Sequence, residues 1–389
     1  MKVIQVTERY PPAVGGVETH VMRLSQELSK LGIEVEVLTT DLYSTVPLVR
    51  IQRVTSTPYE ESVTRVRGYP LLPLPQGLGI VSPSMLRHLR DATIVHAHGY
   101  GHFPTYLTRF CGISNLPVVA TTHSDAGRPS IRKTMFDIIV PRLSIRFAQK
   151  IIAISNHEKQ VLIRRGVSSD RIVVIPNGID IEEIDSKNPK SRKHDNRRTL
   201  MYSGRIDVEQ KGLDILIEAF ARLISVNPEI ELVLMGPDWN DSTRRLRQLA
   251  SKLGIDEKVH FMGYLERKDY LKNLRSADIF VLPSRFEPFG IVLLEAIASS
   301  VPIVASNAGG IPEILGEGKF GLLFNAGDVD SLVSQLQEAL SNEDEAAKRA
   351  EAAKGSLNKY AWSRIAEATL RVYTEVLSKQ KSEMQPIQK

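Results

Sequence analysis

Short runs of β-branched residues alternate along the chain with longer segments in which apolar residues recur every three or four positions. A spacing of two indicates strands, and a spacing near 3.6 indicates helices. Their alternation predicts parallel sheets joined by helical crossovers. In the first half we expect strands at residues 2–7, 34–39, 93–98, 117–121, 150–154 and 171–175, and helices at 17–31, 130–149 and 156–165.

The alternation begins again after residues 185–198, a polar, basic segment that we interpret as a surface loop or a linker. Two such α/β units in tandem predict two doubly wound domains facing a cleft, with ligand-binding loops after the strands. In the second half we expect strands at 199–203, 230–235, 258–261, 278–282 and 302–306, and helices at 213–226, 242–253, 268–275, 290–299, 328–340, 345–357 and 362–379.

Composition narrows the class of protein. The 389 residues are 42% hydrophobic and 24% charged, which excludes a disordered chain. At about 150 residues per domain, this length predicts two domains or three. We find no apolar run of the ~20 residues that a membrane-spanning helix needs. The single Cys111 excludes an internal disulfide framework and a cysteine-based zinc site. We therefore expect a cytoplasmic setting, and the N-terminal segment lacks the apolar core of a signal peptide.

The charge is uneven. Residues 1–180 contain 21 Lys and Arg against 14 Asp and Glu, whereas the remainder contains 29 against 31. A basic half can attract nucleic acid, anionic lipid or phosphorylated substrates. Nucleic acid is disfavoured because the cations are not interleaved with stacking aromatic residues. Residues 131–147 mix cations with bulky apolar side chains, which fits either an anionic membrane surface as partner, on the inner face of the cell membrane, or a buried helix whose cations reach solvent.

Three loops that follow expected strands carry glycines next to a helix: 15–16, 204–212 and 309–310. Backbone amides in such loops can approach an anion, and the helix dipole favours it. In the middle loop, Arg205 and Lys211 are spaced to clamp a diphosphate, one as a planar fork and the other as a point charge. Each feature alone also fits a tight turn or a solvated surface.

Two glutamates stand out near residue 290. Glu287 lies in the loop after an apolar strand, and Glu295 follows eight positions later inside an apolar helix. Burying an unpaired carboxylate is costly, so Glu295 should have a partner. A polyol ligand is one candidate, and a salt bridge from a half-exposed helix position is the other.

The histidines do not indicate a metal centre. His96 and His98 share one face of a strand, with His102 and His123 nearby, but no acidic residue joins them at a familiar ligand spacing. His123 ends a strand and is expected to face the cleft. A Walker loop, a dinucleotide-binding glycine motif and a nucleophile elbow are all missing from the sequence, which disfavours P-loop ATPases, nicotinamide enzymes and serine hydrolases.

Together, the loop at 10–18, the segment 176–180, the Arg205/Lys211 pair and the Glu287/Glu295 pair resemble the retaining glycosyltransferases of family 4, also called glycosyltransferase group 1. The resemblance covers nearly the whole chain. It implies the GT-B architecture of two Rossmann-like domains, with the C-terminal helix crossing back to the first. Residues 1–178 with 362–380 would bind the acceptor, and residues 179–361 would bind the donor.

The resemblance also implies roles. Arg205 and Lys211 would bind the donor diphosphate in place of a metal ion, Glu287 would hold the transferred sugar, and Glu295 would hold the ribose. His123 would contact the sugar and assist the reaction. Further donor contacts are expected from Gly16, Gly263, Leu265, Phe289, Gly290 and Ile291.

The expected activity is retaining transfer of a hexose or N-acetylhexosamine from a UDP- or GDP-sugar to a sugar or lipid-linked acceptor, in glycan, glycolipid or polysaccharide assembly. No metal, other cofactor or nucleic-acid partner is expected. A cytosolic transferase that makes a small soluble glycoside and a non-catalytic nucleotide-sugar-binding relative remain alternatives.

Two positions depart from the family pattern. The spacing from Arg205 to Lys211 is one residue longer than its common form. Arg285 stands where relatives often have a smaller or polar residue, and it could add a cation beside the donor or point to solvent.

Overall fold

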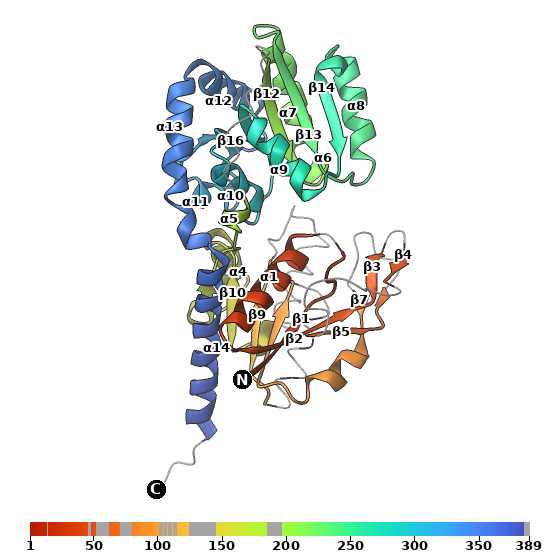
Figure 1. The fold of residues 1–389 in the computed structure, drawn as a ribbon, viewed down its shortest axis with the longest axis vertical. Helices are drawn as coiled ribbons and strands as arrows, with labels where there is room; N and C mark the ends of the chain where they lie inside the picture. The colour runs from red at the N-terminus through yellow and green to blue at the C-terminus, as the bar shows by residue number, and fades with distance from the viewer. Residues whose placement is uncertain are drawn as a thin grey trace. The chain divides into compact units, whose positions relative to one another are not determined.

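The chain forms two compact units, each built on a parallel sheet (Figure 1). One unit comprises Met1–Gly178 and Trp362–Lys389, and the other comprises Ile179–Ala361. The computed structural model describes residues 1–13, 15–45, 48–51, 62–70, 80–100, 104, 107, 111, 115–123, 145–184 and 197–384.

The first unit contains a seven-stranded sheet in the order β11-β10-β9-β8-β1-β2-β5. All of its neighbouring strands run parallel. The order reverses between β1 and β8, so the carboxyl ends of these two strands form a switch point, where ligands bind in open parallel sheets. The strands are β1 (Lys2–Val6), β2 (Glu34–Thr40), β5 (Val63–Val66), β8 (Ile94–His98), β9 (Val118–Thr121), β10 (Lys150–Ala153) and β11 (Ile172–Val174).

Helices cover both faces of this sheet. On one face Val3, Ile94 and Val119 pack with α1 (Gly16–Lys30) and α14 (Trp362–Met384). On the other face the alternate strand positions pack with η2 (Pro83–Leu89) and α4 (Asn156–Arg164). Burial on both faces explains the nearly continuous apolar runs. Because α14 packs beside α1, the expected return of the C-terminal helix to the first unit is confirmed (Figure 1).

Several elements of this unit differ from the sequence expectation. The edge strand β5 and the two short antiparallel pairs were not predicted, because two to four residues show no usable period. These pairs join β3 (Leu42–Thr45) to β4 (Leu48–Arg50) and β6 (Tyr69–Pro70) to β7 (Ile80–Val81).

The helix expected at 130–149 lies outside the described residues up to position 144. Its described end is a 3-10 turn, η3 (Ile145–Phe147), rather than an α-helix. Further 3-10 turns among the described residues include η4 (Ser169–Arg171) and η5 (Asp256–Lys258).

The second unit has a six-stranded parallel sheet in the order β14-β13-β12-β15-β16-β17. The order reverses between β12 and β15, in the Rossmann sequence 3-2-1-4-5-6. The sixth strand was not predicted, since it has only three residues. The strands are β12 (Arg198–Ser203), β13 (Ile230–Met235), β14 (Val259–Gly263), β15 (Ile279–Leu282), β16 (Ile303–Ser306) and β17 (Leu322–Phe324).

The longer helices of this unit lie within about three residues of the expected ranges, and the one-turn helices α5 (Ile181–Ile184) and α6 (Val208–Lys211) were not predicted. The one-turn helix α11 (Ile311–Ile314) follows the 309–310 glycines, where a helix was expected. The longer ones are α7 (Leu213–Ile224), α8 (Ser242–Lys252), α9 (Arg267–Ser276), α10 (Ile291–Ala298), α12 (Val329–Ser341) and α13 (Glu343–Lys354), followed by the 3-10 turn η6 (Leu357–Tyr360). Among the described helices, none is at once long and apolar enough to pass through a bilayer.

The packing of α1 on the sheet can be tested at Leu28, which is fully buried in the core shared with α14. Leu28→Ala should lower the free energy of unfolding of the first unit by about 2–5 kcal/mol, because it removes apolar contacts and leaves a cavity. The chain has two tryptophans, and only Trp362 belongs to the first unit. Urea unfolding followed by Trp362 fluorescence in a Trp239→Phe background reports on this unit.

Leu31→Ala is the matched control. Leu31 ends the same helix but is 42% exposed, so its truncation should change the free energy of unfolding by less than about 0.5 kcal/mol. Equal effects of the two substitutions would contradict the packing described here.

Candidate functional site

The predicted charged residues of the second unit gather at the switch point of its sheet. Arg205 follows β12, and Glu287 lies in the loop between β15 and α10. Lys211 closes α6, the one-turn helix that follows Arg205. The carboxyl ends of β12 and β15 therefore place all three side chains on one edge of the sheet.

Lys211 and Glu287 form a buried ion pair. The Lys211 Nζ lies 2.6 Å from Glu287 Oε2, and their side chains are only 15% and 10% exposed. The Ser284 hydroxyl donates a second hydrogen bond to the same oxygen, at 3.1 Å. Both charges are thus partly removed from water and compensated by each other, as buried ions require.

The longer spacing between Arg205 and Lys211 is taken up by α6. Asp207 caps this helix by accepting hydrogen bonds from the backbone amides of residues 209 and 210, at 3.0 and 3.1 Å. Gly212 ends it with φ of 63°, and a Cβ there would lie 2.3 Å from the carbonyl oxygen of Pro283. This close approach requires glycine and lets Lys211 reach Glu287 despite the extra residue.

Arg205 does not contact Glu287. Its guanidinium donates to Asp207, at 3.2 Å, and to the Gln210 side-chain oxygen. The guanidinium carbon also lies 4.6 Å from the centre of the Trp239 ring, in the range of a cation–π contact. These partners fix the Arg205 guanidinium at the sheet edge. The side chain is 38% exposed, so this cation is also accessible from solvent.

Arg285 corrects both expectations for that position. Its guanidinium forms two hydrogen bonds with the carboxylate of Asp214, at 2.8 and 2.7 Å, and a third with the carbonyl oxygen of Val208, at 2.8 Å. It therefore neither adds a free cation nor extends into solvent. It ties the Glu287 loop to α6 and α7.

The third glycine loop supports Glu287 from the other side. The Gly310 amide donates to the Glu287 carbonyl oxygen, at 3.0 Å. A Cβ on Gly309, whose φ is 57°, would lie 1.9 Å from that oxygen. The amide of Gly310, which we expected to be available to an anion, is used within the protein to fix the loop.

Glu295 has the partner that its apolar surroundings demand. One carboxylate oxygen accepts a hydrogen bond from Arg267 and the other accepts one from the Tyr270 hydroxyl. Arg267 also binds Glu183, at 2.9 Å. Burial and the nearby carboxylate raise the pKa of Tyr270, so its hydroxyl stays protonated and donates. Sequence reasoning missed Arg267 and Tyr270, which lie on the separate helix α9.

The remaining donor-contact residues lie on loops or helix ends. Phe289 is buried, and Gly290, with φ of 98°, precedes α10, whose first residue is Ile291. Gly263 ends β14 with φ of 66°, and Leu265 follows it. Gly16 is the first residue of α1 and is exposed in the first unit.

The first unit carries a cluster of imidazoles at its own switch point, of which His96 and His98 are buried and His123 is half-buried. The Nδ1 of His98 lies 3.0 Å from the Nε2 of His123, and its Nε2 bonds to the Gln5 side-chain oxygen. His96 bonds through Nδ1 to the Tyr373 hydroxyl, at 2.6 Å, and through Nε2 to the Thr121 hydroxyl, at 2.7 Å.

His20 completes this cluster, and its Nδ1 bonds to the Asn177 side-chain oxygen, at 2.9 Å. Burial lowers the pKa of His20 to about 4. Burial and mutual repulsion hold the pKa values of His96, His98 and His123 well below the usual range. All four rings are therefore neutral near pH 7. His20 was not predicted, although it lies near the start of α1, the helix that follows β1 at the same sheet edge.

Within the described ranges, the ligand nitrogens of His20, His98 and His123 lie within 4.8 Å of one another and form the one group with the spacing to hold a metal ion. Two members of this group, His98 and His123, are already joined by a hydrogen bond at 3.0 Å. His102 and the two residues after His123 lie outside the described residues.

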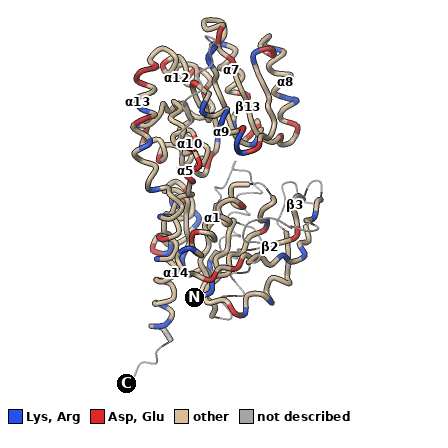
Figure 2. Tube along the Cα trace, viewed as in Figure 1, with Lys and Arg blue, Asp and Glu red and all other residues tan. Residues whose placement is uncertain are grey.

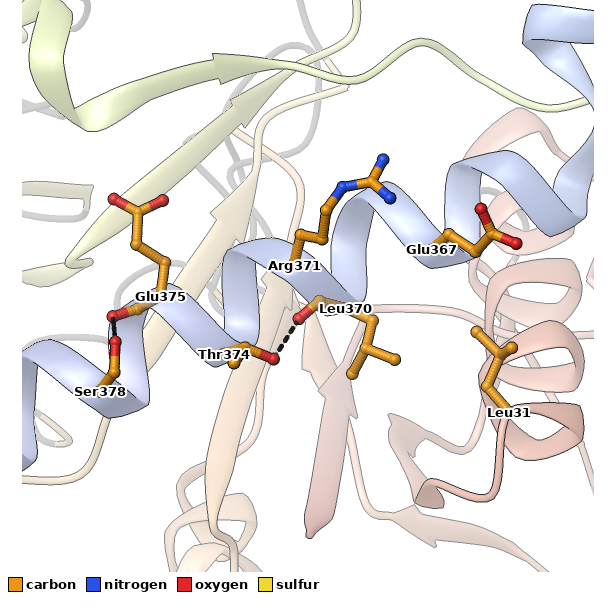
Figure 3. Close-up of a pocket in the computed structure, with 7 residues that line it drawn as sticks. All are labelled: Leu31, Glu367, Leu370, Arg371, Thr374, Glu375 and Ser378. Atoms are coloured by element: carbon orange, nitrogen blue, oxygen red, sulfur yellow. Dashed lines mark hydrogen bonds between the residues drawn. The ribbon is translucent and has the colours of Figure 1, made fainter.

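Figure 3 shows a groove on the first unit that is separate from these residues. The hydroxyls of Thr374 and Ser378 in it already donate to helix carbonyl oxygens, each at 2.9 Å. None of the predicted site residues lines the groove, so it is not the candidate site. Its lining residues are Leu31, Glu367, Leu370, Arg371, Thr374, Glu375 and Ser378.

The cations of the first half do not follow one element among the described residues. Figure 2 shows Lys and Arg spread over several elements of the first unit. Several of them are paired with carboxylates, as in Lys2 with Glu36, at 3.1 Å, and Lys150 with Glu375, at 2.7 Å. Residues 131–144 of the segment that suggested a membrane surface lie outside the described residues.

Both halves of the chain match known family models. Residues 14–183 match the family model described as Glycosyltransferase Family 4, and residues 183–356 match the model described as Glycosyl transferases group 1. A solved structure of Anabaena HepE in complex with UDP and glucose has the same fold, with a TM-score of 0.76 at 20% identity. The alignment covers 96% of this chain and 100% of that one.

Relatives of assigned activity align over nearly the full length. The glycogen synthase of Mycobacterium tuberculosis is 30% identical, covering 99% of this chain and 97% of its own length. The GDP-mannose:cellobiosyl-diphosphopolyprenol alpha-mannosyltransferase of Xanthomonas oryzae pv. oryzae is 25% identical, covering 97% of each chain. The expected resemblance is confirmed, and the chain belongs to the family 4 (group 1) glycosyltransferases with the GT-B fold.

Proposed function

We propose that this glycosyltransferase transfers a hexose or N-acetylhexosamine from a UDP- or GDP-sugar, with retention of anomeric configuration and without a metal ion. The observation that carries the proposal is the buried Lys211–Glu287 pair beside the held cation of Arg205, at the switch point of the second sheet. Cations fixed at that edge suit a diphosphate, and a carboxylate beside them suits sugar hydroxyls.

In the proposed reaction the two cations stabilise the leaving group. As the bond between the anomeric carbon and the diphosphate oxygen breaks, negative charge grows on the phosphate. The positive charges of Arg205 and Lys211 stabilise it. Their positions are fixed by Asp207, Gln210 and Glu287, so little reorganisation accompanies the charge transfer. This is the task that a divalent metal performs in other transferases.

The sugar and the acceptor complete the step. Glu287 accepts hydrogen bonds from hydroxyls of the transferred sugar, and His123 contacts the same sugar. The acceptor hydroxyl attacks the oxocarbenium-like centre from the face that the diphosphate leaves, and its proton passes to the departing phosphate oxygen. Attack on that face retains the anomeric configuration.

Glu295 is suited to hold the ribose. Arg267 and Tyr270 use one lone pair on each of its oxygens, and an ionised carboxylate offers about four acceptor sites. Two sites therefore remain for the two ribose hydroxyls. The backbone near Gly263 and Leu265 is proposed to meet the base, and the start of α10 to meet the sugar.

The nature of the acceptor is proposed more broadly, as a sugar or a lipid-linked sugar. One relative is named for glycogen and another for a diphosphopolyprenol-linked acceptor, so family membership supports both classes. An anionic membrane surface on the cytoplasmic side stays a prediction from the sequence of residues 131–147. The intact charged set disfavours the non-catalytic alternative.

Donor binding should depend on Lys211 and not on a metal. In a thermal-shift screen of UDP-, GDP- and ADP-sugars with EDTA present, a UDP- or GDP-sugar should raise the melting temperature, because ligand that binds only the native state stabilises it. Lys211→Ala should weaken binding of that donor by about tenfold or more, since a hydrogen bond to a charged group contributes roughly 1.5–3 kcal/mol.

Lys252→Ala is the control. Lys252 is an exposed cation at the end of α8, which leads to the amino edge of the sheet, so donor binding should be unchanged. If no nucleotide-sugar shifts the melting temperature, or if Lys211→Ala binds as tightly as the unaltered protein, the donor assignment is wrong.

The charge of Glu287 should matter for turnover. Glu287→Gln keeps the shape but leaves Lys211 without its counter-ion, so kcat/KM should fall by about 10²–10³-fold. Steady-state release of the nucleoside diphosphate measures this loss. Glu257→Gln, at an exposed position before β14, should leave the rate unchanged. A Glu287→Gln variant with near-full activity would remove this residue from the mechanism.

Retention can be observed directly. With the donor found in the screen, the first product that proton NMR detects should carry the anomeric configuration of the donor. The early time points decide the configuration, because a free reducing sugar released to water mutarotates later. An inverted product would refute same-face attack while leaving the donor assignment intact.

A further inference from the structure

The face of the first sheet that α1 and α14 cover changes character along the strands. At its amino half, Val3, Ile94 and Val119 belong to the apolar core. The alternation of strand side chains places the next residues on the same face. Those residues are polar and at most 1% exposed: Gln5, His96 and Thr121. His98 lies one step further, and His123 follows β9 at the sheet edge.

These polar side chains form one continuous hydrogen-bond chain. From the edge inward, His123 contacts His98, His98 contacts Gln5, and the Gln5 amide nitrogen lies 3.3 Å from the Tyr373 hydroxyl. The Tyr373 hydroxyl then reaches His96, which ends the chain at the Thr121 hydroxyl. The chain therefore links α14 to the edge residue His123.

The orientation of the Gln5 amide sets the direction of every proton. Its nitrogen donates to Tyr373, so its oxygen accepts from His98 Nε2. A neutral imidazole has one donor and one acceptor nitrogen, which leaves His98 Nδ1 as an acceptor. His123 must then donate through Nε2. Its own Nδ1 carries a lone pair.

The electrostatics of the cluster agree with this assignment. Burial and neighbouring imidazoles lower the pKa values of His96, His98 and His123, so each ring is neutral and exists as one tautomer or the other. Burial raises the pKa of Tyr373, so its hydroxyl keeps its proton and passes a hydrogen bond to His96. With the Gln5 amide in this orientation, the chain has one consistent set of donors and acceptors.

The backbone indicates that His123 is held in place. Its φ is 50°, a left-handed conformation that a residue with a side chain adopts at a free-energy cost. The hydrogen bond to His98 and the edge contact with His20, whose ring centre lies 4.5 Å away, offset that cost. The ring is thus fixed in orientation as well as in protonation.

We propose that Gln5, His98 and Tyr373 are positioning residues that lock His123 as its Nε2–H tautomer, so that its Nδ1 accepts a hydrogen bond from a hydroxyl of the transferred sugar. The proposal rests on the proposed function, in which His123 contacts that sugar. A hydroxyl can donate to Nδ1, whereas a phosphate oxygen cannot. The lock therefore selects the sugar over the diphosphate as the partner of His123.

The tautomers can be read by NMR on the whole protein labelled with ¹⁵N-histidine. Long-range proton–nitrogen correlations distinguish the two neutral forms from the cation, and single His→Gln variants assign the signals. We expect His123, His98 and His96 as Nε2–H tautomers at pH 7 and His20 as the Nδ1–H tautomer. His123 found as the Nδ1–H tautomer, or charged, would overturn the proposal. Metal-bound nitrogens in the protein as purified would overturn it too.

Tyr373→Phe tests the far end of the chain without changing its volume. Loss of the hydroxyl frees Gln5 to rotate, so the His98 and His123 signals should show both tautomers. The kcat should fall on the order of tenfold with little change in the KM for the donor. Such an effect is typical of residues that orient a ligand-binding side chain. Gln5→Leu should do the same more strongly, and Gln5→Glu, which still accepts from His98, should preserve the His123 tautomer.

Thr369→Val is the matched control. Thr369 is a buried residue of α14 whose hydroxyl bonds only within the helix, at 2.8 Å to the Ile365 carbonyl oxygen, so its loss should leave the tautomers and kcat unchanged. Unchanged tautomers in Tyr373→Phe would overturn the proposal and leave the transferase assignment intact. Full activity of His123→Ala would instead remove His123 from the proposed reaction, and the positioning role with it.

Discussion

The arrangement of the second unit depends on keeping two opposite charges together out of water. Neither Lys211 nor Glu287 could be buried alone, since an unpaired ion in a protein interior costs several kcal/mol. The surrounding loops hold the pair. Arg285 fastens the Glu287 loop to α6 and α7, and Gly309 lets the next loop pack against the Glu287 carbonyl group. A ligand that meets this pair therefore finds a cation and an anion already set in position.

The two units use one topology for different chemistry. In each sheet the strand order reverses beside the first strand, and the polar residues lie at the carboxyl ends of the strands that flank the reversal. The second unit places charged groups there, which suit an ionic ligand such as a diphosphate. The first unit places neutral imidazoles, which suit hydroxyl groups. On the proposed function, this difference separates the leaving group from the sugar that is transferred.

The sequence predicted the parallel sheets and the positions of Arg205, Lys211, Glu287 and His123, because each follows a recognisable apolar strand. It did not predict the partners of these residues. Arg267 and Tyr270 reach Glu295 from another helix, and Gln5 and Tyr373 reach His98 and His96 from opposite ends of the chain. The spacing of apolar residues along the sequence does not reveal such contacts. Elements such as α6 and β17 are too short to show any regular spacing. Arg285 is another example, because a hydrogen bond to Asp214 orients its side chain, and the sequence did not indicate that contact.

The low pKa values of the imidazoles follow from burial and have a consequence for the proposed reaction. The transferred sugar develops positive charge as its bond to the diphosphate breaks, and an imidazolium beside it would raise the energy of that state. A buried ring that stays neutral, as His20 does until the pH falls toward 4, avoids this repulsion. It can still accept a hydrogen bond from a sugar hydroxyl. The first unit thus favours a partner that is polar but uncharged, whereas the fixed cations of the second unit favour the anion that leaves.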